Sequence, residues 1–148
     1  NGLSGGYTGG FFSDTWTYQT NAPATSSLAG SGCASAVGLP TMNVQPLPWL
    51  GETLTWTVAN MPPGGIPLLV VGTNNTTVNL APLGAPACDL HVSPDVIVTA
   101  LGPVALPIPN NLSLLGFQIH SQAVAFEPLP NGFAVALSDA NSLTIGAR

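Results

Sequence analysis

The chain has 148 residues, enough for one domain with a sizeable core, yet only 5% of them are charged. Its formal net charge is -5 and Arg148 is its single basic residue, which excludes the Lys/Arg footprint of nucleic-acid binding or of a polybasic membrane surface. Pro and Gly interrupt every apolar run, so we also expect no membrane insertion. A surface with so little charge predicts a cover of attached sugar or partner subunits.

The chain begins at Asn1 without a Met, and we expect it to be a mature, exported chain. Its two cysteines, Cys33 and Cys88, fit one disulfide formed in an oxidising compartment, with two buried free thiols as the alternative. The expected location is therefore extracellular, as part of a cell-surface appendage.

The first predicted element is an N-terminal strand at about residues 11–20, within a Gly-rich arm. Phe12, Trp16 and Tyr18 fall on one face, and mostly hydroxyl-bearing residues alternate with them on the other. This alternation predicts a half-buried β-strand. Because no hairpin partner lies beside it, the strand must join a sheet in its own domain or in a neighbour.

A run rich in Ala, Ser and Gly follows the arm at residues 21–32 and is typical of a linker. We therefore divide the chain into an arm with its linker, residues 1–29, and a β-sandwich domain, residues 30–148.

Beyond the linker, the chain predicts many short strands separated by Gly, Pro and Asn turns. In residues 53–59 the apolar side chains of Leu54, Trp56 and Val58 alternate inward, while residues 66–71 form an apolar run typical of a strand covered on both faces. Asn131-Gly132 signals a hairpin. Further strands are expected at 39–44, 78–80, 96–101, 104–108, 115–126, 133–137 and 143–145. We predict an all-β fold: an antiparallel β-sandwich, Ig-like or jelly-roll-like, with an extended N-terminal arm.

Several segments resemble a known module: GSGCASAVGLP, PWLGETLTWTVANMPPG, GAPACDLHVSPD, PIPNN and SLTIG. They run in the order of a two-cysteine C-terminal module of large secreted bacterial proteins, which often follows kelch-type β-propeller repeats. The resemblance covers residues 30–146, matches its paired cysteines to Cys33 and Cys88, and departs at Ala87, where the module has Gly, and in the SDANS hairpin. It implies a secreted β-sandwich without a defined activity.

The arm's FFSDTWTYQT separately resembles the last strand of a kelch blade. A blade needs about 50 residues and four strands, so the arm cannot form a propeller here.

No catalytic constellation is present, and we expect neither an enzyme nor a cofactor. Asp89 and His91 share a strand face that could form half of a metal site, but His120 is distant in sequence, and we favour a solvated strand face. We likewise expect Ser93-Pro94-Asp95 to be a turn rather than a calcium loop. The sequence therefore predicts no metal site.

Two kinds of residue suggest contact with sugar. Asn74 and Asn75 lie in overlapping sequons within a polar turn, and Asn111 begins a third sequon, so these three are candidates for glycosylation. Trp49, between Pro48 and Leu50, is a candidate platform for sugar stacking, whereas Trp56 is expected in the core.

The function that these features favour is structural. We expect an extracellular subunit that assembles head-to-tail into a glycosylated fibre, with the arm of one copy supplying a strand to the next. A heterologous contact of this kind propagates unless it closes into a ring. The expected partners are copies of the chain itself and glycans. The alternative is a secreted polysaccharide-binding or anchoring module whose arm folds back in cis.

Overall fold

The computed structural model describes residues 22–35 and 37–148. These residues form an all-β fold built from antiparallel strand pairs, and the described ranges contain no α-helix. The predicted fold class is therefore confirmed. The predicted arm strand, with Phe12, Trp16 and Tyr18, lies outside the described residues.

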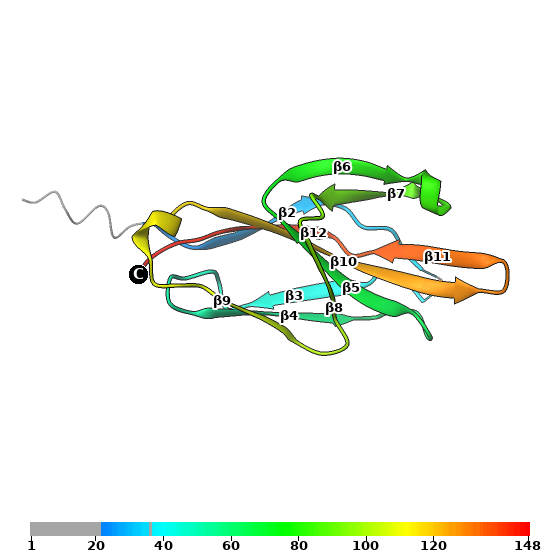
Figure 1. Cartoon of the computed structure of the whole chain (residues 1–148), viewed down its shortest axis with the longest axis horizontal. Helices are drawn as coiled ribbons and strands as arrows, with labels where there is room; N and C mark the ends of the chain where they lie inside the picture. Colours follow the sequence, from blue (N-terminus) through cyan, green and yellow to red (C-terminus); the bar gives the residue numbers. More distant parts are fainter. Residues whose placement is uncertain (1–21, 36) are drawn as a thin grey trace, which may run out of the picture.

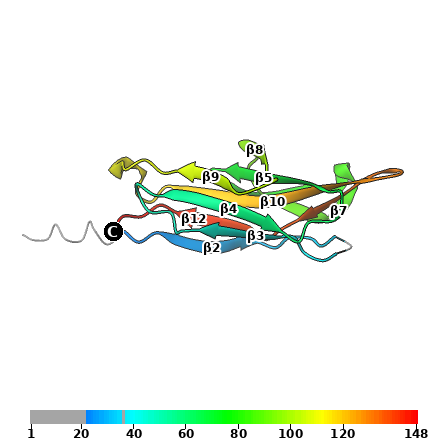
Figure 2. The ribbon, with the colours of Figure 1, turned by 90° about the horizontal axis from the view of Figure 1, so that it is seen from below.

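The largest sheet has six strands and forms the middle layer of the molecule (Figure 1). Its strands are β2 (Thr25–Gly30), β5 (Ile66–Gly72), β8 (Val96–Thr99), β10 (Gln118–Leu129), β11 (Gly132–Leu137) and β12 (Ala140–Thr144). The main path runs β2-β12-β10-β5-β8, and β11 pairs with β10. Strands β2 and β8 therefore lie at opposite edges, as Figure 2 shows.

Two smaller sheets lie on opposite sides of this layer (Figure 1). One contains β3 (Thr41–Gln45), β4 (Thr53–Ala59) and β9 (Val104–Pro107) in the order β3-β4-β9. The other is a ribbon of β6 (Asn75–Leu80) and β7 (Ala85–Val92), joined through the 3-10 helix η2 (Ala81–Leu83). A second 3-10 helix, η3 (Leu112–Leu114), precedes β10. The fold is a β-sandwich with an additional ribbon on its second face.

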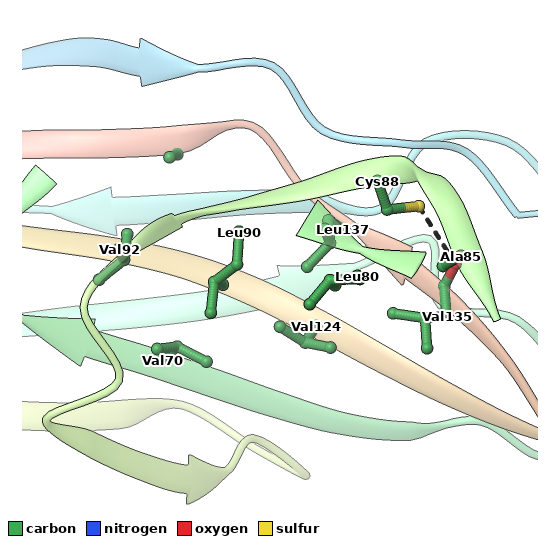
Figure 3. Close-up of a cluster of buried hydrophobic side chains, with 10 residues drawn as sticks. Val70, Leu80, Ala85, Cys88, Leu90, Val92, Val124, Val135 and Leu137 are labelled. Carbon is green, nitrogen blue, oxygen red and sulfur yellow. Dashed lines mark hydrogen bonds between the residues drawn. The ribbon is translucent and has the colours of Figure 1, made fainter. Parts of the chain in front are cut away.

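Successive residues of β5 belong to two different cores. Leu69 packs in a cluster with Leu54 and Trp56 of β4, whereas Val70 packs with Leu90 on the β7 side. Figure 3 shows the cluster that contains Val70 and Leu90, on the side of the central sheet that the β6–β7 ribbon covers. The apolar run at residues 66–71 is thus a strand covered on both faces, as predicted.

The predicted linker is wrong for part of its length. Thr25–Gly30 forms β2 and pairs antiparallel with β12, so these residues belong to the central sheet. The side chains of β2 are mostly exposed, including Leu28 at 74%. Because only the small side chain of Ala29 packs against a core cluster, the sequence of β2 lacks the apolar alternation that indicates a strand, and backbone pairing defines it instead.

The predicted disulfide is present between Cys33 and Cys88. Cys33 exchanges backbone hydrogen bonds with Leu137, with N–O distances of 2.9 and 3.0 Å, and Cys88 lies in β7 beside Val135 (Figure 3). The bond therefore ties the outer ribbon to the segment that follows β2 and to the end of β11.

The segment that leads into β2 is held against the last residues of the chain. Ala147 N donates a hydrogen bond to Ala22 O at 2.8 Å. A Cβ on Gly146 would lie only 2.1 Å from Ala24 N, so this close crossing requires glycine. The described chain thus enters the fold at the β2 edge, next to the C-terminal segment (Figure 2).

Candidate assembly cleft

An apolar cleft of about 300 Å³ opens between the edge strands of the two sandwich sheets. Strand β8 of the central sheet and β9 of the smaller sheet form its two sides. The residues that line it come from five strands and from the turns after β5 and before β8: Trp56, Val71, Gly72, Thr73, Asp95, Val96, Val98, Val104, Ala105, Leu106 and Ile119. Its lining is almost wholly apolar, and Thr73 and Asp95 stand at its margin.

The floor of the cleft is formed by buried side chains, and the indole N–H of its tryptophan has a hydrogen-bond partner. Trp56 is buried and its Nε1 donates a hydrogen bond to Ser121 Oγ at 3.0 Å. Beside it, Ile119 belongs to the same buried cluster as Leu54. No unpartnered indole N–H therefore faces the cleft, and its floor is suited to aromatic or aliphatic groups.

The Asp95 carboxylate fixes one margin of the cleft. Its Oδ2 accepts hydrogen bonds from Thr73 N at 2.9 Å, Thr73 Oγ1 at 3.1 Å and Ser93 Oγ at 2.9 Å. The bond from the Thr73 backbone N–H, followed by that from Ser93, lowers the pKa of Asp95. Asp95 is therefore ionised at neutral pH and joins the turn after β5 to the turn before β8.

Strand β8 is an unusually apolar edge. Val96 and Ile97 are 53% and 54% exposed, and β8 pairs with β5 alone within the described residues. On the face opposite the cleft, Ile97 also lines a second apolar groove of about 140 Å³ with Leu83 and Phe126. An exposed apolar edge strand is a template for pairing with another chain unless charge, proline or a covering segment blocks it.

The three predicted glycosylation residues are all exposed. Asn74 lies in the bend after β5, Asn75 begins β6, and Asn111 precedes η3. The Asn111 side-chain oxygen accepts a hydrogen bond from Ser113 N at 3.0 Å, which caps η3 within the sequon itself. All three sequons are thus accessible, and Asn74 lies next to Thr73 at the margin of the cleft.

The sugar-stacking candidate Trp49 is half-buried rather than a free platform. The Arg148 guanidinium lies 4.8 Å from the centroid of its ring, in a cation–π contact, and the same guanidinium forms an ion pair with Glu52. One face of the ring is therefore covered. Trp56 is in the core, as predicted.

The residues weighed as half of a metal site remain apart. Asp89 Oδ1 accepts a hydrogen bond from Asn79 Nδ2 at 2.8 Å, and the ring of His91 packs against Gly30. The His120 ring is buried on β10 and bonded to Ser142. Among residues 22–35 and 37–148, no three His, Cys, Asp or Glu side chains are grouped so as to hold a metal ion.

The cleft itself is not among the sequence predictions. Its residues are spread over five separate segments, and only the topology brings them together. The available signal was indirect, since residues 96–101 and 104–108 read as apolar strands joined by one short turn. That pattern does not reveal that they belong to different sheets.

No protein-family model, curated protein or solved structure matches the chain. The resemblance to the two-cysteine secreted module thus stays a prediction. Within the described part of the chain, no helix has the length and apolar character needed to cross a bilayer.

Proposed function

We propose that the chain is an extracellular structural subunit that assembles head-to-tail into a fibre by strand complementation. The arm of one copy, with Phe12, Trp16 and Tyr18 on one face, occupies the cleft between β8 and β9 of the next. The observation that carries this proposal is the apolar cleft between two sheet edges, which offers both an open backbone edge and an apolar floor.

The length of the arm limits which of its residues could enter the chain's own cleft. The arm joins the fold at the β2 edge, and β8 lies four inter-strand spacings away, about 19 Å at about 4.8 Å each. Tyr18 is four residues from Ala22, a distance of at most about 14 Å when extended. The backbone of Tyr18 therefore cannot reach β8 of its own sheet, whereas Phe12, ten residues from Ala22, could span up to about 35 Å and reach it. The state of assembly, and not the reach of the arm, separates insertion in trans from insertion in cis.

A donor site and an acceptor site at different places on the subunit make a heterologous contact. The donor leaves from the β2 edge and the acceptor lies at the β8 edge, so a pair of subunits keeps one free arm and one free cleft. Such a contact extends into a filament unless the rotation closes a ring.

Burial of the aromatic face supplies the main driving force. Three aromatic side chains remove roughly 500 Å² from water, a gross stabilisation on the order of 10 kcal/mol at about 25 cal/mol per Å². Truncating two of the three aromatic side chains removes roughly two-thirds of this gross stabilisation. A reversible contact between subunits does not survive a loss of that size.

The first experiment compares two matched arm variants by sedimentation velocity and negative-stain imaging. Phe12→Ala/Trp16→Ala removes the proposed buried face, and Phe11→Ala/Thr17→Ala removes the opposite face. We expect filaments from the wild type and the second variant, and monomers from the first. Wild-type protein that stays monomeric at high concentration would overturn the proposal in favour of a binding module.

A mixing experiment separates donor from acceptor. Leu106→Asp places a charge in the cleft lining, and Leu101→Asp places one at a residue that is 83% exposed and outside the lining. We expect Leu106→Asp to stay monomeric and Leu101→Asp to assemble. Mixing Leu106→Asp with Phe12→Ala/Trp16→Ala leaves one intact arm and one intact cleft, so the mixture should form dimers and nothing longer.

The extracellular setting and the glycans belong to the same proposal. A disulfide is typical of proteins that fold in oxidising compartments, and the three sequons are exposed. Attached sugar would supply the polar cover that a surface with so few charges lacks. Intact-mass measurement of the native fibre tests this, with extra mass expected on Asn74, Asn75 or Asn111 and an unmodified mass contradicting it.

A further inference from the structure

Two strand edges border the cleft, and their backbone hydrogen-bonding groups differ. Along a strand, the N–H and C=O groups of successive residues point to alternate sides. In β8, Ala100 N donates to Pro67 O at 2.9 Å, in the register that pairs Val98 with Leu69. Even-numbered residues therefore face β5, and Ile97 and Thr99 direct both their N–H and C=O groups to the free edge.

The free edge of β9 has fewer N–H donors than that of β8. Ile108 N donates to Glu52 O at 2.8 Å, continuing the register that pairs Leu106 with Leu54. Even-numbered residues thus face β4, and the outward positions are 103, 105 and 107. Two of these are Pro103 and Pro107, which have no N–H, so Ala105 is left as the single outward donor.

We infer that the arm of a second copy pairs with β8 rather than with β9, an inference that rests on the proposed function. β8 offers two complete N–H and C=O pairs, whereas the prolines of β9 block a ladder. The occupant is the segment around residues 11–19, which lies outside the described structure and contains no proline.

Pairing at β8 also relates the two faces of the arm to the cleft. Val96 and Val98 line the cleft, whereas Ile97 lines the groove on the other face. Residues directly opposite one another on adjacent strands share a face. In the proposed assembly the arm residues opposite Val96 and Val98 belong to the face that carries Phe12, Trp16 and Tyr18, and the Ser and Thr residues fall on the outer face.

A pair of proline substitutions tests the choice of edge. Thr99→Pro removes an outward N–H of β8 and leaves the inward bonds of Val98 and Ala100 in place. Ala105→Pro removes the outward N–H of β9 in the same way. We expect Thr99→Pro to raise the concentration needed for assembly by about tenfold or more, and Ala105→Pro to leave it within about twofold.

Amide hydrogen exchange gives a second readout that does not depend on the folding of a proline variant. The full-length Phe12→Ala/Trp16→Ala protein serves as acceptor, and a synthetic peptide of residues 8–21 serves as donor. We expect the peptide to slow exchange at Ile97 and Thr99 by tenfold or more while Ala105 is unchanged.

The outcomes separate this inference from the proposed function. Protection at Ile97 and Thr99 supports pairing at β8. Protection at Ala105 alone, or arm-dependent assembly that tolerates Thr99→Pro with no protection at β8, overturns the β8 inference while the fibre proposal stands. A wild-type chain that does not assemble and does not bind the peptide overturns both.

Discussion

Trp56 Nε1 donates a hydrogen bond to Ser121 Oγ across the interface between β4 and β10, with an N–O distance of 3.0 Å. The two residues are 1% and 0% exposed. The bond joins the smaller sandwich sheet to the central sheet directly beneath the cleft. It also satisfies an indole N–H that would otherwise be buried without a partner.

Ser121→Ala should therefore lower the free energy of unfolding by about 1–3 kcal/mol, because it leaves the Trp56 N–H buried and unsatisfied. Urea titration followed by tryptophan fluorescence measures the change. Ser27→Ala, at an exposed position on β2, is the control and should change stability by less than about 0.5 kcal/mol. Equal midpoints for the two variants would show that the bond contributes little.

The buried His120 predicts a pH dependence of stability. Burial lowers the pKa of His120 below its usual value of 6.5, and Nδ1 lies 2.6 Å from Ser142 Oγ. Between the folded and unfolded pKa values the unfolded chain binds more protons, so this contribution to stability is complete above about pH 6.5 and is lost as the pH falls. Denaturant titrations from pH 7.5 to 5 should show a smaller loss of stability for His120→Gln than for the wild type. Identical losses would mean that His120 protonates as easily in the fold as outside it.

The strands that sequence alone predicts are those whose pattern reflects burial. In β4, Leu54 and Trp56 are buried, and the alternation marks them. Strand β2 was missed because its residues, TSSLAG, pack only the small side chain of Ala29 against a core cluster and are held by pairing with β12. An edge strand fixed by backbone bonds alone leaves no periodic signal.

Burial of polar residues on β10 likewise depends on the ribbon formed by β6 and β7. Gln122 is fully buried because its side-chain oxygen accepts from His91 N at 2.8 Å and its Nε2 donates to Ser138 O at 2.9 Å. Such a residue reads as solvent-facing until the ribbon partner is known. The cleft escaped prediction for the same reason, since Val98 and Trp56 meet only through the packing of two sheets.

The disulfide should contribute substantially to stability. Cys33 and Cys88 are 55 residues apart, and closing a loop of this length in the unfolded chain stabilises the fold by about 4 kcal/mol in the chain-entropy model. The Cys33→Ser/Cys88→Ser variant should lose about that amount in urea titration. A reducing agent should weaken the wild type in the same way and have no effect on the double variant. A wild type that is insensitive to reductant under denaturing conditions would contradict this prediction.

Gly146→Ala should damage the point where the described chain enters the fold. The new Cβ would lie 2.1–2.4 Å from backbone atoms of residues 22–24, so either this segment or the end of β12 must shift. We expect a loss of about 1–3 kcal/mol in unfolding free energy, as for other overpacked sites. Gly102→Ala is the matched control because no atom lies within 4 Å of its added Cβ, and it should change stability by less than about 0.5 kcal/mol. If the arm emerges from this crossing to reach a neighbouring subunit, Gly146→Ala should also weaken assembly at temperatures where the body remains folded. Full assembly by a destabilised Gly146→Ala protein would show that the position of the crossing does not govern the contact between subunits.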